Sequence, residues 1–457
     1  MVNALSRLAF AGQVLMVVFT VLDMVWPSHA GVWAIALSSA VFVLGARSPM
    51  SAGLRRTVWA LVLGTLFLLP WTTQPWVTLE KGIRIGGLIS AILLSVSLLS
   101  RAAQRVQVLR EVVRRLLDVP ARQRSVTVPV ASQVFAGFLG FAGVAMLMEA
   151  ASRLPDPSPE ANRECFQGIS RGYAAANLWS PMYSNISILL ALSPGLTWAA
   201  IFPYALLLAL VSLVLGYAME RFARRHDAAD AGVPVPWRAV AGVAWPVMLG
   251  MLVFLLCALG LSGLAHVPIA ALIVILSPIA ALLLTVYLGP QRLGWGESAA
   301  QLVNEFRDFR LLAGEVRMLM ASGCAGTVIA AAIPAAWTLP LAHALAPFPV
   351  LACLFLATAV VLISCTSVHP MLSGIVVTSA FPAVAMGLPP TAHVLAVLAG
   401  LGLAVVTTPF SVLSLTASRF SGLPLLTVSM KANLGFAAIS LVLVGLILGG
   451  SASRFAH

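Results

Sequence analysis

The chain has 457 residues, of which 60% are hydrophobic and only 9% are charged. An ordinary soluble domain has about 25% charged residues, so this composition excludes one. A mean hydropathy of +0.99 predicts an all-α polytopic membrane protein, because a bilayer requires backbone groups to be satisfied inside helices. The 35 Gly and 28 Pro predict that several of these helices are kinked or broken.

The net charge of +12 comes from basic residues in short connections beside apolar runs. They gather in three places, at Arg47, Arg55 and Arg56, between Arg101 and Arg124, and at Arg221, Arg224 and Arg225. The positive-inside rule places these connections in the cytoplasm, with the N-terminus on the same side of a bacterial-type inner membrane. The expected partner is therefore the lipid bilayer and not a nucleic acid.

In chain order, apolar runs predict roughly 10–13 transmembrane helices, some of them interrupted by polar residues. The expected spans are Leu8–Trp26, Gly31–Gly45, Val58–Trp71, Gly86–Leu99, Val128–Ala150, Gly172–Leu192, Trp198–Ala218, Ala239–Leu261, Val267–Leu288, Met320–Trp337, Pro349–Ser364, Val368–Val384, His393–Leu413 and Phe436–Leu448. Three apolar stretches lie between the second and third basic connections, where an even number of crossings is needed. Either Val128–Ala150 or Gly172–Leu192 should therefore be re-entrant or broken.

Two further segments, Arg101–Leu117 and Ser298–Met318, place apolar residues at helical spacing among charged ones. We expect both to be amphipathic helices on the membrane surface. A solvated cytoplasmic helix would explain either segment alone equally well.

Short sequence matches indicate an internal duplication. Residues 103–111 and 300–308 share the pattern A-Q-x-V at an offset of 197, and residues 181–186 and 370–375 share P-M-x-S-x-I at an offset of 189. Transporters commonly carry such repeats. The chain is therefore divided into N-terminal helices (1–100), a first repeat core (101–218), connecting helices (219–297), a second repeat core (298–413) and a C-terminal span (414–457).

The strongest local signal is the polar run from Arg171 to Ser187. Unpaired polar groups in hydrocarbon are costly, so a broken helix is expected, with free carbonyls for a cation and a half-helix N-terminus for an anion. The candidate substrate-binding residues of this run are Arg171, Asn177, Ser180, Ser184, Asn185 and Ser187. The alternative is a proline kink whose polar side chains bond to neighbouring helices, with Arg171 anchoring a helix end.

The run from Ser364 to Ser379 also places polar residues inside an apolar stretch, so a second broken helix is expected there. Its histidine titrates near physiological pH and can bind substrate or relay protons, or it can be an ordinary packed side chain. The candidate substrate-binding residues are His369, Ser373, Thr378 and Ser379. Gly374 stands where the first run has Asn185 and gives backbone access, so the candidate Na⁺ ligands are Ser184, Asn185 and Gly374.

No hydrolase, zinc-protease, Walker or Rossmann motif occurs, and the five cysteines are scattered without a CxxC pair. We therefore expect no enzyme and no cofactor, apart from Na⁺ as a candidate coupling ion. No Asp or Glu follows Glu315, and the apolar runs hold only Asp23 and Glu149. Proton coupling would thus depend on Glu149 or His369.

The order of parts resembles the ion transporter superfamily, especially the divalent anion:sodium symporters. A surface helix, a hairpin-like segment, a broken helix and a further span follow one another twice between Arg101 and Leu413. The resemblance implies Na⁺ and carboxylate sites at Ser-Asn-Thr signatures, and surface helices that act as arms for an elevator movement. Ser184 and Asn185 match this signature, whereas Ile186 replaces its Thr and the second copy departs further.

These features predict a secondary transporter that moves a small organic anion by alternating access, coupled to Na⁺ or H⁺ and working as a homodimer. Basic residues near both polar runs and the half-helix N-termini favour an anion. Residues 172–192 and 368–384 are expected to meet near the bilayer midplane. The alternative is a membrane-embedded subunit or scaffold without transport, in which the breaks serve packing.

Overall fold

The computed structural model describes residues 2–46, 48, 50–154, 159–223, 235–290, 293–366 and 368–452. Within these ranges every regular element is a helix. The elements are α1 (Val2–Val25), α2 (His29–Gly45), α3 (Ala52–Leu68), η1 (Leu69–Trp71), α4 (Pro75–Arg105), α5 (Gln107–Leu117), α6 (Ala121–Leu139), α7 (Phe141–Ala151), α8 (Pro159–Trp179), α9 (Ser184–Leu192), α10 (Trp198–Ala223), α11 (Trp237–Ala265), α12 (Ile269–Leu288), α13 (Trp295–Asp308), η3 (Phe309–Leu312), α14 (Ala313–Ala332), α15 (Ala335–Leu345), α16 (Pro349–Cys365), α17 (Pro370–Ala380), α18 (Pro390–Thr407), α19 (Val412–Ser421), the π-helical turn η4 (Thr427–Lys431), α20 (Ala432–Val444) and the π-helical turn η5 (Gly445–Gly449).

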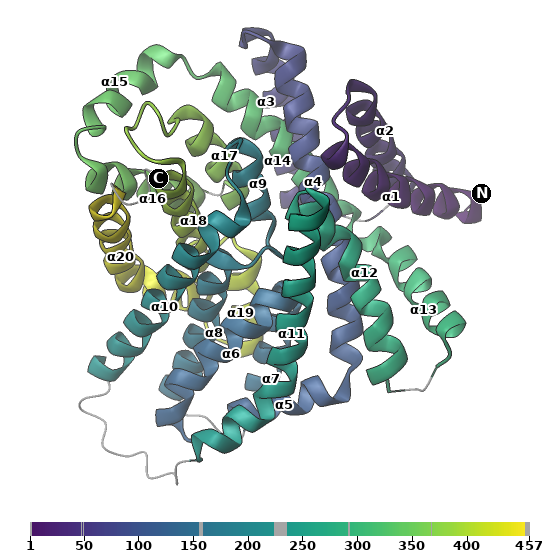
Figure 1. The fold of residues 1–457 in the computed structure, drawn as a ribbon, viewed down its shortest axis with the longest axis vertical. Coiled ribbons are helices and arrows are strands. Elements are labelled where there is room, and N and C mark those ends of the chain that lie inside the picture. The colour runs from purple at the N-terminus through teal and green to yellow at the C-terminus, as the bar shows by residue number, and fades with distance from the viewer. Residues whose placement is uncertain are drawn as a thin grey trace.

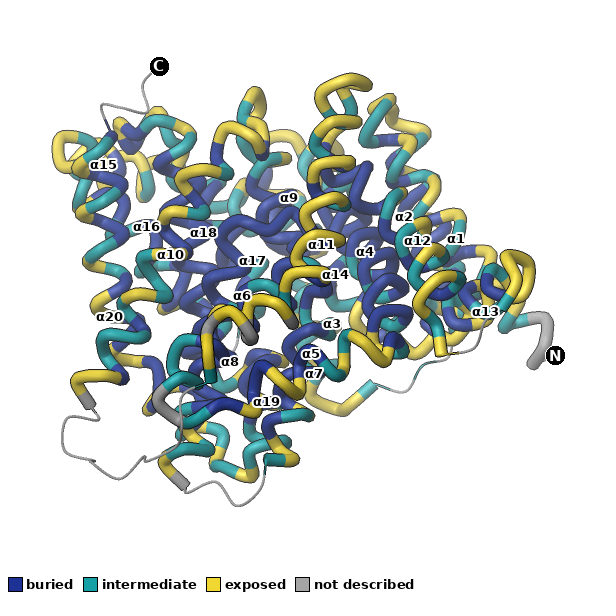
Figure 2. Tube along the Cα trace, turned by 60° about the horizontal axis from the view of Figure 1, so that its bottom comes forward, coloured by how far each residue is buried: buried dark blue, intermediate teal, exposed yellow. Residues whose placement is uncertain are grey.

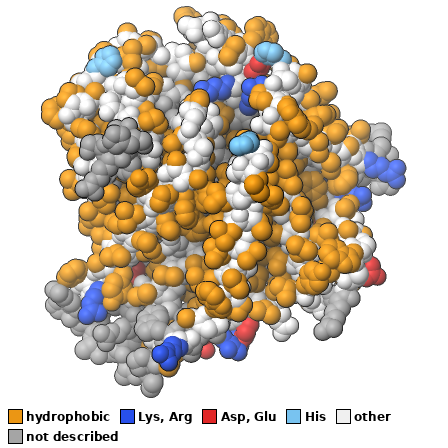
Figure 3. Space-filling view, viewed as in Figure 1, with side chains coloured by type: hydrophobic (Ala, Val, Ile, Leu, Met, Phe, Trp, Pro, Cys, Tyr) orange, Lys and Arg blue, Asp and Glu red, His pale blue; other side chains and the backbone are white. Residues whose placement is uncertain are grey.

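Nine helical stretches of the described residues are long and apolar enough to cross a membrane, and four shorter apolar helices accompany them. Hydrophobic side chains cover the middle of the face shown in Figure 3, and charged ones gather toward its ends and right edge. The predicted fold class, an all-α polytopic membrane protein, is confirmed.

The core of the bundle holds the interrupted helices. Figure 2 shows α4, α9, α17 and α18 mainly in the colour of buried residues, whereas α11 is mostly exposed. Glycines let two of the long helices approach closely: a Cβ on Gly323 of α14 would lie 2.6 Å from the backbone nitrogen of Gly86 in α4. The bundle therefore buries its broken segments behind continuous spans.

The basic connections near α3 and α4 lie at one end of the bundle. Ser48, between α2 and α3, donates its hydroxyl to the carbonyl of Leu311 at 3.1 Å. The guanidinium of Arg105, at the end of α4, pairs with Glu305 of α13. Figure 1 places α5 low in the bundle, near the start of α11, and shows α10 ending low at the left. Three of the basic residues named above lie outside the described residues: Arg47, Arg224 and Arg225.

Both segments predicted to be surface helices are helical, with shorter bounds than expected. α5 starts at Gln107 because residues 101–105 continue α4, and it buries Val113 and Leu117 while Arg114 and Arg115 stay exposed. The second segment forms α13, which ends at Asp308, and residues 313–318 already belong to α14.

The chain turns or breaks at four places in the core. Gly140 has a φ of +57°, a conformation that glycine adopts without strain, and it joins α6 to α7 as a hairpin. Residues 180–183 separate α8 from α9, residues 366–369 separate α16 from α17, and residues 408–411 separate α18 from α19. Both candidates for an interruption in the first half are therefore interrupted.

Two of the expected spans are interrupted within their bounds. Residues 393–413 are not one helix, because α18 ends at Thr407 before Pro409. Pro334 likewise ends the expected span 320–337, and a separate helix, α15, follows it. Proline lacks the N–H that would continue a helix and restricts the residue before it, which accounts for both ends.

Candidate functional site

The break between α8 and α9 is fastened to the α6–α7 hairpin. Ser180 donates its hydroxyl to the carbonyl of Gly137, in the last turn of α6. The same hydroxyl accepts the backbone N–H of Met182 at 3.2 Å. The last carbonyls of a helix have no intrahelical partner, so the hydroxyl of Ser180 caps α6 while it holds the break open.

The break between α18 and α19 is fastened to the α16–α17 hairpin in the same way. Thr408 donates its hydroxyl to the carbonyl of Ser364, in the last turn of α16, at 3.3 Å. The same hydroxyl accepts the backbone N–H of Phe410 at 3.2 Å. The two breaks therefore share one hydrogen-bond pattern.

Close helix packing repeats at the same spacing. A Cβ on Gly172 of α8 would collide with the carbonyl of Pro129 in α6, and a Cβ on Gly400 of α18 would collide with the carbonyl of Ala357 in α16. Both pairs lie 228 residues apart in the chain, as do the two cap residues of the breaks. The packing thus matches 172–192 with residues near 400–420, and not with 368–384 as the short sequence match suggested.

The polar runs 172–192 and 368–384 nevertheless meet, because α9 packs against α17. The hydroxyl of Ser184 lies 3.8 Å from the sulfur of Met371. Asn185 donates its side-chain amide to the side-chain oxygen of Asn177 at 2.9 Å, which ties α9 back to α8 across the break. The N-terminal ends of α9 and α17, which we call the tips, are therefore adjacent. Figure 1 shows these two helices next to each other.

Several polar atoms of α9 and α17 are buried without a hydrogen-bond partner among the described residues. They are Asn185 Oδ1 and Ser187 Oγ near the start of α9, and Thr378 Oγ1 two turns further along α17 than Met371. Unsatisfied buried polar atoms are rare in native proteins and need an explanation. All three atoms can accept a hydrogen bond, and amide or hydroxyl oxygens can coordinate a hard cation.

Other predicted site residues have structural partners. His369 accepts the backbone N–H of Met371 at 3.3 Å and caps α17. Ser373 contacts the hydroxyl of Ser364 at 2.8 Å, inside the hairpin. A Cβ on Gly374 would lie 3.1 Å from Leu401, so packing accounts for this glycine. Ser379 is half-buried.

Arg171 does not reach the tips. It is 3% exposed and lies between α8, α10 and α20, where its Nη1 is 3.5 Å from Oε1 of Glu220. The sequence interpretation missed Glu220 because it ended this span at Ala218, whereas α10 continues to Ala223. The signal was present, since Arg171 and Glu220 are opposite charges inside or beside apolar runs.

The two acids of the apolar runs, of which Glu149 was a candidate for proton coupling, lie elsewhere. Asp23 pairs with Arg84 at 3.1 Å between α1 and α4. Glu149 pairs with Arg153 at 2.6 Å, and its side chain is 52% exposed. Neither carboxylate contacts the tips of α9 and α17.

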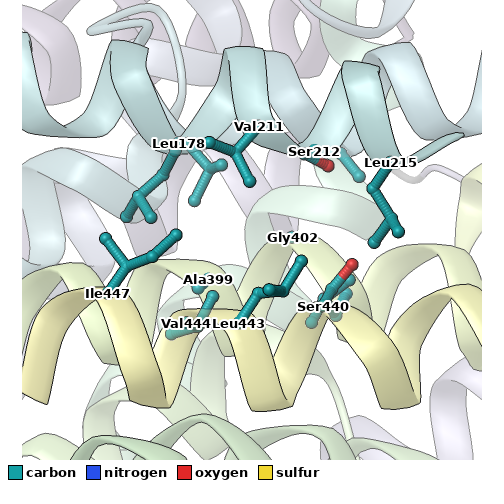
Figure 4. A pocket seen from close by; sticks show the side chains of 13 residues that line it. Leu178, Val211, Ser212, Leu215, Ala399, Gly402, Ser440, Leu443, Val444 and Ile447 are labelled. Atoms are coloured by element: carbon teal, nitrogen blue, oxygen red, sulfur yellow. The ribbon is translucent and has the colours of Figure 1, made fainter. Parts of the chain in front are cut away.

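An apolar groove separates α10 from α20, as Figure 4 shows. Its empty volume is about 430 Å³ and its lining is mainly aliphatic, with Ser212 and Ser440 as polar exceptions. This chemistry suits a hydrocarbon chain and not a charged solute, so the groove is not the candidate site.

No protein-family model matches the chain, and no curated protein matches it in sequence. The solved structure of the YdaH transporter from Alcanivorax borkumensis does match its fold. The alignment covers 87% of this chain and 98% of that chain, with a TM-score of 0.58 and 16% sequence identity. The chain has the fold of a membrane transporter.

At this identity the likeness to YdaH extends to the fold alone. That structure is described as having an unusual topology. The expected transporter fold is thereby supported, whereas the narrower resemblance to divalent anion:sodium symporters is not confirmed.

Proposed function

We propose that this chain is a secondary active transporter that moves a small organic anion across the membrane by alternating access, coupled to Na⁺ or H⁺. The observation that carries the proposal is the pair of helix breaks. The hydroxyl of Ser180 fastens the first break to the α6–α7 hairpin, and the hydroxyl of Thr408 fastens the second break to the α16–α17 hairpin. Discontinuous helices near the middle of the membrane are the usual site of transport in such folds. The YdaH-like fold adds support.

The substrate site is placed at the tips of α9 and α17. The N-terminus of α9 begins at Ser184, and its free N–H groups favour an anion. The unpartnered oxygens of Asn185 and Ser187 provide neutral ligands for a cation or acceptors for substrate hydroxyl groups, and Thr378 offers a further oxygen deeper along α17. Gly374 and Arg171 are no longer part of this site, because each has a packing partner elsewhere.

The two hairpin-and-break units are proposed to be repeats of one ancestral unit, offset by 228 residues. Their shared caps and shared glycine contacts support this offset over the shorter ones read from sequence matches. The basic end of the bundle is placed in the cytoplasm of a bacterial-type inner membrane, following the positive-inside rule. Elevator-like movement and a homodimeric assembly belong to the same proposal.

The alternative is a membrane-embedded scaffold without transport. It is favoured by the caps themselves, because Ser180 and Thr408 satisfy carbonyls that any packed hairpin would need to satisfy. The two functions differ in the role of the unpartnered oxygens. A scaffold would not need buried oxygen atoms that bond to no other described residue.

The test is uptake of labelled organic anions into proteoliposomes, under a Na⁺ gradient and separately under a pH gradient. Asn185→Ala should abolish gradient-driven uptake. Asn162→Ala is the matched control, since Asn162 also lies on this interrupted helix pair but bonds to the carbonyl of Ser421 at 3.0 Å, away from the tips. Absence of wild-type uptake under either gradient would reject the proposal for the anions tested and favour the scaffold.

A further inference from the structure

Two opposite charges are buried together where α8, α10 and α20 meet. Arg171 is 3% exposed and Glu220 is 6% exposed. Ionisable side chains inside a membrane are costly and usually mark an ion or proton pathway. Neither residue has a role at the tips of α9 and α17, so the pair needs its own explanation.

The guanidinium of Arg171 does not depend on Glu220 for its hydrogen bonds. It donates to the carbonyl of Ala432 at 3.2 Å, to Oδ1 of Asn433 at 3.4 Å and to the carbonyl of Gly216 at 3.5 Å. Its centre also lies 4.7 Å from the ring centroid of Phe436, a cation–π distance. These partners are neutral, so Arg171 stays satisfied when Glu220 loses its charge.

The contact between the two charges is loose. Its 3.5 Å separation exceeds the about 2.7–2.9 Å of a charge-assisted hydrogen bond. Burial favours the neutral form of a carboxyl group, whereas a nearby guanidinium favours the charged form. Both influences act on Glu220, which is buried and lies beside Arg171.

Glu220 also lines a cleft of about 280 Å³ beside the N-terminal ends of α6 and α8. The other lining residues are Arg124, Ser125, Ala161, Glu164, Cys165 and Gly168. The cleft leaves room for about one water molecule beside these residues.

The charged and titratable groups around Glu220 come from the helices that pack against α10. α6 contributes Arg124, and α8 contributes Glu164, Cys165 and Arg171. Arg221 of α10 itself and Lys431 beside α20 are exposed. The titratable side chain of α18, His393, bonds to the carbonyl of Phe381 at 2.8 Å. Of these groups, Arg171 forms an ion pair with Glu220, at 3.5 Å.

A chain of hydrogen bonds leads from this pair to the second helix break. Asn433, which accepts from Arg171, donates its side-chain amide to the carbonyl of Val406 at 3.2 Å. Val406 lies two residues before Thr408, the cap of that break. A movement of Arg171 would therefore be transmitted through Asn433 to the end of α18.

We infer that Glu220 is the proton-binding group of this protein, loaded through the cleft and sensed by Arg171. The inference rests on the proposed transport function and names its coupling ion. The carboxylate takes one proton from water in the cleft, forming one O–H bond, while Arg171 keeps its own proton. The site gains one positive charge, and release of that proton after the conformational change restores the starting state.

The test is infrared difference spectroscopy of the reconstituted protein between about pH 9 and about pH 5, the range in which a perturbed carboxyl group titrates. Acidification should produce the carbonyl-stretch band of a neutral carboxylic acid. Glu220→Gln should lose this band, and Glu149→Gln, which removes an exposed carboxyl group paired with Arg153, should keep it. Glu220→Asp should keep the band with a shifted midpoint, which guards against a folding defect in the Gln variant.

An unchanged band in Glu220→Gln would overturn the inference and make the ion pair a fixed structural contact. The measurement uses neither substrate nor gradient, so this result would leave the transport function untouched. For any anion that the wild type accumulates, Glu220→Gln should abolish accumulation driven by a pH gradient but retain exchange of labelled for unlabelled substrate. A merely structural role would reduce both.

Discussion

Ser180 and Thr408 make the same contacts in two separate parts of the bundle. Each hydroxyl donates to a carbonyl in the last turn of a hairpin helix, Gly137 for the first and Ser364 for the second, across 43 and 44 residues of chain. Each also accepts the backbone N–H two residues further on. A hydroxyl and a following proline are all that the two sequences share here, so the equivalence is one of geometry.

Removing either cap should destabilise the protein. Ser180→Ala and Thr408→Val leave a buried carbonyl without this partner, which lowers the free energy of unfolding by about 1–3 kcal/mol each. Because the caps lie in separate hairpins, the losses should add in the double variant. Unfolding of the purified protein in detergent measures this. Thr57→Val, which removes an intrahelical bond on α3, should show almost no loss.

Adding a Cβ at either of two equivalent glycines should destabilise the protein. Gly172→Ala and Gly400→Ala place a Cβ against a backbone carbonyl that cannot move aside, and overpacking of this kind lowers the free energy of unfolding by about 1–3 kcal/mol. Gly250→Ala is the control, because a Cβ there meets nothing within 4 Å. Equal unfolding midpoints for all three variants would contradict the packing described for α6–α8 and α16–α18.

The unpartnered hydroxyls should matter for transport and not for stability. Ser187→Ala and Thr378→Val remove oxygens that bond to no described residue, so the unfolding free energy should stay within about 0.5 kcal/mol of wild type. Uptake should fall roughly tenfold, the loss expected for one hydrogen bond of about 1.4 kcal/mol to a ligand. The proposed site would be wrong if stability fell while uptake by the folded fraction stayed normal.

The pair of Arg105 and Glu305 should couple α4 to α13. The carboxylate is 6% exposed and the guanidinium 38% exposed, so solvent screens the contact only in part. A double-mutant cycle with Arg105→Ala and Glu305→Ala should give a coupling energy of about 0.5–3 kcal/mol. Additive single effects would show that α13 is positioned by its apolar face, through Leu302, and by the buried Phe309 of η3 that follows it.

Composition and periodicity were sufficient to predict the fold class and most helices. Apolar runs identified the spans because burial in lipid leaves few other choices, and the interruption expected in 128–150 or 172–192 occurs in both, at Gly140 and at residues 180–183. The polar runs near residues 180 and 370 were also correctly expected to meet. These successes depend on local chemistry, which a sequence records directly.

The internal correspondence could not be predicted in the same way. The match of Pro181 with Pro370 shares more letters than the match of Pro181 with Pro409, yet the hydrogen bonds support the latter. Glu220 was missed for a related reason: its importance comes from Arg171, 49 residues earlier, and from burial by a third helix. Contacts between distant segments require the fold.

The contact between Ser184 and Met371 has a mechanical consequence. At the opposite end of α8, the hairpin-and-break units are joined by hydrogen bonds from Asn162, Gln167 and Arg171 to the segment 421–433. At the tips the recorded polar contact is a hydroxyl against a thioether, which is a weak acceptor. The polar contacts recorded between these parts thus lie along α8, whereas at the tips apolar side chains such as Ile188 and Ile375 hold α9 against α17. Separating the tips would therefore expose apolar surface and break few hydrogen bonds.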